Sequence, residues 1–139
     1  MIILDTNVIS ALMRREPDPN VVAWLDGLPA ESSWTTSVTV FEVRLGLEIL
    51  EAGRRRLQLE EAFDRALEED FEGRVLPFDV AAAQAAGRIA ADRHRAGRTV
   101  EIRDVQIAGI AKARRATLAT RNTRHFEGCG VALVDPWAE

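Results

Sequence analysis

Short segments typical of strands alternate with longer segments of helical periodicity along this chain, and no other feature of the sequence restricts the fold as much. The predicted strands lie at residues 2–4, 34–37, 74–78, 117–120 and 131–134, and the first of them is a continuous apolar run that ends at Asp5. The predicted helices lie between them, at residues 20–28, 38–50, 54–72, 80–97 and 102–114. Strands that alternate with helices form βαβ crossovers, which give a parallel sheet with helices on both faces. We therefore predict an α/β fold with a mostly parallel sheet of roughly five strands, and we expect ligands beyond the carboxyl ends of the strands.

Proline, glycine and aspartate mark several of the predicted helix ends. Pro19 and Pro29 flank the helix at 20–28, because proline suits the first helical position and stops a helix that precedes it. Gly53 stands where a C-terminal cap of the helix at 38–50 belongs. Asp79 is placed to cap the helix at 80–97.

The composition is typical of one soluble domain. The chain has 139 residues, of which 47% are hydrophobic, and this is enough to bury a core without staples. No apolar run approaches the roughly 20 residues of a membrane span, and Asp5 ends the first run too early for a signal peptide. The single cysteine, Cys129, can form no internal disulfide, which suits a reducing compartment. We expect a single cytoplasmic domain over residues 1–139 with no membrane contact.

The net charge of −4 argues against a protein that binds nucleic acid through its overall charge. The cations are nevertheless clustered, and nearly all of them are arginine, the side chain suited to forked contacts with phosphate. Arginines at helix ends are more commonly solvated caps than binding sites. The charge pattern alone therefore does not decide whether the protein binds nucleic acid.

Two aspartates lie where predicted elements end or begin. Asp5 closes the first strand in the tripeptide 5–7, where it either forms a turn that caps a following helix or presents a carboxylate at the edge of the sheet. Asp104 lies in the first turn of the helix at 102–114, on its apolar face, where it either satisfies the helix dipole or serves a site. Both interpretations are open at each position.

Glu42 lies in the helix at 38–50 with no lysine or arginine four residues away to pair with it. Thr39 and Glu42 match a capping box, in which the glutamate would bond the backbone at the helix start. Alternatively, the apolar neighbours, including Phe41 and Leu45, leave this helix little solvent-facing surface, so that the carboxylate needs a partner such as a metal ion.

Asn122 follows the strand at 117–120, where a fourth acid would complete the cluster. Its amide offers a neutral oxygen ligand or can orient a metal-bound water, and an ordinary turn explains the residue equally well. The three acids are all expected at the same end of the sheet, and one shared site accounts for them better than three coincidences.

With these residues in view, the chain resembles PIN-domain proteins of the VapC and FitB-like class. Five segments carry the resemblance, in family order along essentially the whole chain, at residues 2–10, 39–46, 103–108, 119–123 and 134–137. The resemblance implies a PIN-like three-layer α/β/α domain with an acidic site formed by Asp5, Glu42 and Asp104. Many members carry an acid at the position of Asn122 or three residues later, and here the later position is His125.

The resemblance further implies an Mg²⁺-dependent endoribonuclease, with Mn²⁺ as a substitute metal. Asp5 and Asp104 match the usual metal ligands, and Glu42 would hold a second ion or orient the attacking water. Asn122 would complete the catalytic group and Thr6 would support it. The candidate RNA contacts are Arg14, Arg15, Arg121 and Arg124, with His125 as a further candidate.

The partners that the resemblance implies are those of a type II toxin–antitoxin pair. They are an RNA substrate, a small VapB-like antitoxin and a second copy of the chain, in a homodimer and a toxin–antitoxin hetero-oligomer. Trp24, Leu25 and Leu28 could line a groove for the amphipathic tail of the antitoxin. They are equally consistent with plain core.

Two further functions compete with this interpretation. A haloacid-dehalogenase-type phosphohydrolase also places an aspartate after the first strand, but it needs a second one at the position of Asn7, and a receiver-like phosphoacceptor needs a lysine near the last strand, whereas Lys112 lies inside a helix. A PIN scaffold that only binds, having lost activity with the fourth acid, is the other alternative.

Overall fold

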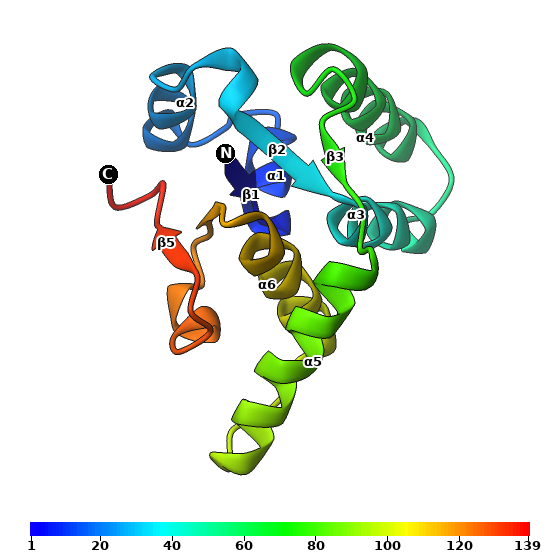
Figure 1. Ribbon diagram of the computed structural model, residues 1–139. Helices are drawn as coiled ribbons and strands as arrows, with labels where there is room; N and C mark the ends of the chain where they lie inside the picture. Colours follow the sequence, from blue (N-terminus) through cyan, green and yellow to red (C-terminus); the bar gives the residue numbers. More distant parts are fainter.

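Five short strands form one parallel sheet in the computed structural model, which describes residues 1–139 (Figure 1). The strands are β1 (Ile2–Leu4), β2 (Ser33–Thr36), β3 (Val75–Leu76), β4 (Thr117–Ala119) and β5 (Ala132–Val134). Their order is β3-β2-β1-β4-β5, and every neighbouring pair is parallel. The predicted α/β class and parallel sheet are confirmed.

Six α-helices connect the strands. They are α1 (Thr6–Leu12), α2 (Pro19–Asp26), α3 (Ser37–Ile49), α4 (Arg54–Arg65), α5 (Val80–Arg95) and α6 (Ile102–Arg114). Three short turns supplement them, namely the 3-10 turns η1 (Ala30–Ser32) and η3 (Thr123–Phe126), and the π-turn η2 (Ala66–Asp70) that continues α4. None of the helices combines the length and the apolar character needed to cross a membrane.

The two faces of the sheet bury separate apolar clusters. Ile3 and Leu4 belong to different clusters, because successive side chains of a strand point to opposite faces. One cluster packs the sheet against α5 and α6, with Ile89 and Ile107 among its members. The other packs it against α1 to α4, with Val8, Val43 and Phe63 among its members. This is the predicted three-layer α/β/α arrangement.

The strands that follow β1 in the sequence are added first on one side of it and then on the other. β2 and β3 are added on one side of it, and the crossover through α5 and α6 then brings β4 to the other side (Figure 1). The carboxyl ends of β1 and β4 therefore form the switch point of the sheet, the place at which parallel sheets generally bind ligands. Asp5 directly follows β1, and Thr120 directly follows β4.

Several predicted boundaries were wrong. The helix predicted at 20–28 ends at Asp26. Helix α1 was not predicted, because its seven residues are too few to show a helical periodicity of apolar side chains. Gly53 does not cap α3, which ends with Leu50 in an extended conformation; the glycine instead precedes α4. The predicted helix at 102–114 is confirmed, as is the Asp79 cap, whose carboxylate accepts a hydrogen bond from the Ala82 amide at 2.9 Å.

Candidate active site

Asp5 presents a nearly buried carboxylate at the carboxyl ends of the paired strands β1 and β4. The residue is only 5% exposed. Oδ1 accepts a hydrogen bond from the Thr6 amide at 2.8 Å, while Oδ2 accepts one from the Thr120 hydroxyl at 2.8 Å and one from the Asn7 side-chain amide at 3.3 Å. No lysine or arginine pairs with it. A buried carboxylate without a cationic side chain beside it is costly, so this group is suited to bind a cation.

Burial raises the pKa of Asp5 above its ordinary value, and the negative charge of Asp104 raises it further. The hydrogen bonds from Thr120 and Thr6 act in the opposite direction, because they stabilise the ionised form. Asp5 thus has both roles considered for it, since it caps α1 through the Thr6 amide and also presents a carboxylate at the sheet edge.

Glu42 lies in the second turn of α3, half-buried beside α1. Its Oε1 accepts a hydrogen bond from the Thr6 hydroxyl at 3.0 Å, and its Oε2 lies 3.5 Å from a guanidinium nitrogen of Arg103. Burial raises its pKa, as does Asp5, whereas Thr6 and Arg103 lower it. Glu42 has no cationic partner on its own helix, and Arg103 of α6 provides one instead.

The predicted capping box at Thr39 was wrong. Thr36 caps α3 instead, accepting a hydrogen bond from the Thr39 amide at 3.1 Å, because β2 runs directly into the helix without a loop. The expectation that α3 has little solvent-facing surface was also wrong, since Phe41 is 56% exposed and Leu45 is 37% exposed. The capping explanation for Glu42 is thereby excluded.

Asp104 lies at the third residue of α6, half-buried. Its backbone amide donates to the Glu101 side chain at 3.0 Å, so the capping role belongs to Glu101. Its own carboxylate lies 3.2 Å from Nδ1 of His125, which comes from η3. Burial raises the pKa of Asp104, as does the charge of Glu101, and His125 lowers it.

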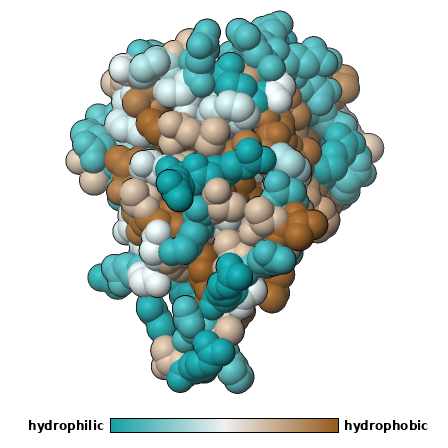
Figure 2. Space-filling model, viewed as in Figure 1, coloured by the Kyte–Doolittle hydropathy of each residue, from teal (hydrophilic) through white to brown (hydrophobic).

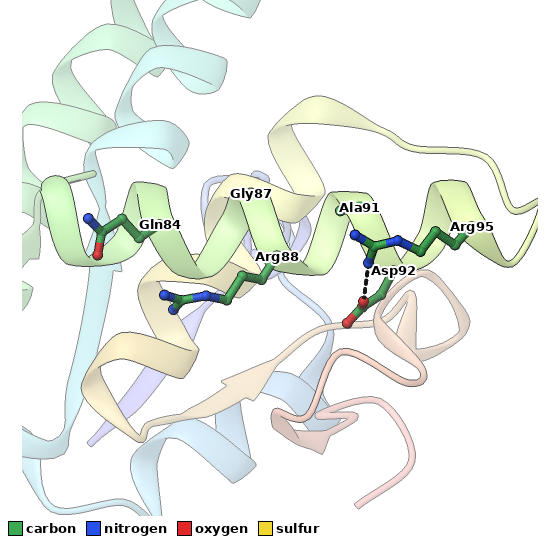
Figure 3. Close-up of a pocket in the computed structure, with 6 residues that line it drawn as sticks. All are labelled: Gln84, Gly87, Arg88, Ala91, Asp92 and Arg95. Carbon is green, nitrogen blue, oxygen red and sulfur yellow. Dashed lines mark hydrogen bonds and ion pairs between the residues drawn. The ribbon is translucent and has the colours of Figure 1, made fainter.

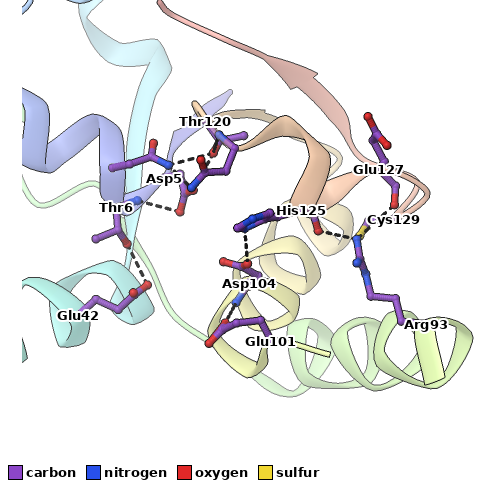
Figure 4. A network of polar contacts seen from close by, with 12 residues as sticks. Asp5, Thr6, Glu42, Arg93, Glu101, Asp104, Thr120, His125, Glu127 and Cys129 are labelled. Atoms are coloured by element: carbon purple, nitrogen blue, oxygen red, sulfur yellow. Dashed lines mark hydrogen bonds and ion pairs between the residues drawn. The ribbon is translucent and has the colours of Figure 1, made fainter. Parts of the chain in front are cut away.

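The three carboxylates converge from three separate elements, as Figure 4 shows. Asp104 acts on the pKa of Asp5, Asp5 on that of Glu42, and Glu42 on that of Asp104, so each is within electrostatic reach of the next. No three His, Cys, Asp or Glu side chains are placed to enclose one metal ion together. The arrangement is therefore an open acidic site rather than a closed protein cage.

Hydroxyl and amide groups that sequence reasoning missed hold the acids in place. Thr120 is fully buried and bonds Asp5, and its hydroxyl also lies 3.3 Å from the Asn7 amide nitrogen. The side-chain oxygen Oδ1 of Asn7 accepts a hydrogen bond from the backbone amide of Arg121 at 3.3 Å, which ties α1 to the loop after β4. Thr39 bonds Thr6 at 3.0 Å. The only signal was position, since Asn7 and Thr120 each follow a strand end.

The structure brings only some of the other candidates to this site. The side chain of Asn122 is exposed and makes no hydrogen bond within the chain, while its backbone amide donates to Thr120 at 3.1 Å. Arg121 lies over the ring of Trp137, 5.0 Å from its centroid. Arg124 lines a pocket that also contains Asp104 and His125. Arg14 lines a groove without any of the three acids, and Arg15 is exposed without an intrachain partner.

The oxygen groups fit a hard divalent cation such as Mg²⁺. This ion prefers oxygen ligands, keeps several of its waters and commonly takes only one or two protein carboxylates. The buried Asp5 and the nearby Asp104 meet that description, and the open arrangement leaves room for water and a phosphate oxygen. No thiol or group of imidazoles competes for a softer metal.

The fold and the site together define an α/β protein that gathers carboxylates at the switch point of a parallel sheet, an arrangement suited to divalent-ion chemistry. The PIN-domain family model matches residues 2–129. The chain belongs to the PIN-domain family, within its VapC and FitB-like group.

Particular relatives agree with this assignment over their full length. The chain is 42% identical to "Toxin FitB" of Neisseria gonorrhoeae and 38% identical to "VapC ribonuclease Y4jK" of Sinorhizobium fredii, with at least 98% of each chain covered. The structure is similar to the crystal structure of FitAcB from Neisseria gonorrhoeae, with a TM-score of 0.91, 39% identity and all of both chains covered.

Proposed function

We propose that this protein is an Mg²⁺-dependent endoribonuclease that acts as the toxin of a type II toxin–antitoxin pair. The observation that carries this proposal is the buried Asp5 carboxylate, which has hydrogen-bond donors but no lysine or arginine beside it. Asp104 is close enough to raise the pKa of Asp5, and Asp5 is close enough to raise the pKa of Glu42. The names of the two relatives, a toxin and a ribonuclease, support the reaction class.

Each acidic side chain has a distinct proposed role. Asp5 and Asp104 hold the metal ion, directly or through water, and Glu42 orients the attacking water or holds a second ion. The bound ion would polarise the scissile phosphate and lower the pKa of a bound water. Thr6 and Thr120 keep the carboxylates of Glu42 and Asp5 in position through their hydroxyl groups.

The direct test is cleavage of RNA by the purified protein. We expect cleavage in Mg²⁺ or Mn²⁺ that stops when EDTA is added, and none by the Asp5→Ala variant, whose folding is checked by circular dichroism. If Asp5→Ala cleaves as fast as the wild type, the activity comes from a contaminant and the site is wrong. If the wild type itself is inactive with both metals, the binding-only scaffold is the better explanation. Trapping of a phosphoenzyme would instead favour the phosphohydrolase.

The affinity for Mg²⁺ should fall as the pH is lowered, and the fall should begin above the ordinary carboxylate range. The pKa values of Asp5, Glu42 and Asp104 are all raised by burial, so protons compete with the ion at a higher pH than they would at exposed acids. Isothermal titration calorimetry at a series of pH values measures this. An affinity that stays constant through the acid range would show that these groups do not bind the ion.

A groove between α1, α2 and the end of α4 is the proposed antitoxin site. It has a volume of about 630 Å³, and Leu25 and Leu28 line it together with apolar side chains of α1. Trp24 does not line the groove; it packs against the apolar cluster of that layer. Half of the lining residues are hydrophobic, which suits the apolar face of an amphipathic helix.

Replacing Leu25 by glutamate should weaken binding of the antitoxin by at least about tenfold, because burial of one leucine side chain contributes about 1.5–3 kcal/mol. The probe is the product of a short reading frame adjacent to this gene, and the measurement is its dissociation constant. Ala23→Glu is the matched control, since Ala23 is exposed on the same helix and lies outside the groove. Equal affinities for both variants would place the antitoxin elsewhere.

A further inference from the structure

The pocket that Arg124 lines together with Asp104 and His125 is a hollow that adjoins the acidic site, beside the loop between α5 and α6. It has a volume of about 350 Å³, and Asp104 and His125 form its boundary with the acidic site. The remaining lining residues are Arg93, Arg98, Thr99, Glu101, Val105 and Arg124. Three guanidinium groups thus meet in one depression beside a candidate metal ligand.

Arg93 holds the loop that forms one wall of this hollow. Its guanidinium donates to the backbone carbonyls of His125 and Glu127 and lies 3.1 Å from Sγ of Cys129 (Figure 4). Because Arg93 is on α5 and His125 is in η3, this contact fixes the distance between the two walls. The wall that contains His125 is therefore held in place by packing against α5.

Arg98 and Arg124 are the cations that remain available. Arg98 makes one hydrogen bond, to the Glu127 carbonyl at 3.3 Å, and Arg124 makes none within the chain. Neither forms an ion pair, although Glu101 and Asp104 line the same hollow. Guanidinium groups that form no ion pair keep donors free for an external anion such as phosphate.

We propose that this hollow binds a backbone phosphate of the RNA substrate next to the scissile one, with Arg98 and Arg124 as the contacts. The inference rests on the proposed nuclease function, which places the scissile phosphate at Asp5 and Asp104. An RNA strand whose scissile phosphate lies at Asp104 can continue into this hollow, where Arg98 and Arg124 offer forked guanidinium donors. The guanidinium groups of Arg103 and Arg121 outside the hollow already lie against Glu42 and Trp137. The hydroxyl of Thr99 supplies a further donor to phosphate or ribose.

A matched pair of control arginines lies on the outer face of α5. Figure 3 shows a shallow depression lined only by residues of this helix, among them Arg88 and Arg95. Arg95 pairs with Asp92 at 3.1 Å. In the space-filling view, mostly hydrophilic side chains cover the C-terminal end of α5, at the bottom of the molecule (Figure 2). Two substitutions here change the net charge by the same amount as two substitutions in the hollow.

The experiment compares the double variants Arg98→Gln/Arg124→Gln and Arg88→Gln/Arg95→Gln. Binding of a short single-stranded RNA oligonucleotide of mixed sequence is measured in EDTA at several salt concentrations, and cleavage is measured in Mg²⁺. For the hollow variant we expect binding at least about tenfold weaker, and a slope of log Kd against log salt reduced by about 0.7 for each phosphate that is no longer neutralised. KM should rise with kcat unchanged, because these residues bind the strand away from the reacting atoms.

The control variant should bind and cleave like the wild type. A salt slope for the hollow variant equal to that of the wild type, or an equal change in both variants, would overturn the proposal. A fall in kcat with unchanged KM would overturn it as well. If the wild type cleaves no RNA in Mg²⁺, the nuclease proposal fails, while the salt slopes in EDTA still decide whether the hollow binds phosphate. Thermal melts verify that all variants are folded.

Discussion

Replacing Asp104 by asparagine is expected to lower the rate of RNA cleavage in saturating Mg²⁺ by at least about a hundredfold, equivalent to roughly 2.7 kcal/mol of lost transition-state stabilisation. The amide has nearly the shape of the carboxylate but no negative charge, so it holds a divalent cation poorly. The fold should persist, because the cap of α6 uses the side chain of Glu101 and only the backbone amide of Asp104.

The measurement is a time course of cleavage of the same RNA by wild type, Asp104→Asn and a charge-matched control. Asp92→Asn serves as that control, since Asp92 is on α5 with its side chain largely exposed and pairs only with Arg95. We expect the control to cleave at the wild-type rate. Wild-type activity in Asp104→Asn would mean that the acid on α6 takes no part in the reaction.

Replacing Gly109 by alanine is expected to destabilise the protein by about 1–3 kcal/mol, although alanine is the better helix former by about 1 kcal/mol. A Cβ atom at Gly109 would lie 2.5 Å from the carbonyl oxygen of Ala82 and 2.7 Å from Cβ of Ala86. The first of these neighbours is backbone and the second is attached directly to it, so α5 and α6 would have to move apart. These two helices supply much of the apolar cluster on one face of the sheet.

The melting temperature of Gly109→Ala should therefore fall by several degrees, at roughly 2–4 °C for each kcal/mol in a domain of this size. Gly87→Ala on α5 is the matched control, because a Cβ atom there meets nothing within 4 Å. This variant should melt at a higher temperature than the wild type, since only the helix propensity changes. A Gly109→Ala protein as stable as Gly87→Ala would contradict the close approach of the two helices.

The elements that could be predicted are the long helices with a clear apolar face and the strands formed by strongly apolar residues. The segment at 102–114 shows its helical face over thirteen residues and was predicted at its observed bounds. The apolar run at 2–4 forms β1 as predicted, because a strand buried on both faces is apolar without alternation. α1 was not predicted, since its seven residues are stabilised by packing against the sheet rather than by local propensity.

The acidic site could be predicted only as a set of positions. Asp5, Glu42 and Asp104 stood out because each is a carboxylate in or beside an apolar segment. Their partners did not stand out, because Thr120 and Asn7 are ordinary turn residues in the sequence, and Arg103 is 61 residues away from the glutamate that it faces. Long-range hydrogen bonds of this kind leave no local pattern.

The sequence by itself determined the order of strands and helices, and with it the parallel sheet and the end of that sheet at which the acids gather. These properties follow from the periodicity of burial along each segment, because the apolar or polar character of each side chain is written in the sequence itself. Only the tertiary structure decided which groups meet there, namely the buried Thr120 hydroxyl on Asp5, His125 on Asp104, and the arginines of the neighbouring hollow. The physical reason is that hydrogen bonds and ion pairs act over a few ångströms, so they depend on how separate segments pack and not on their spacing along the chain.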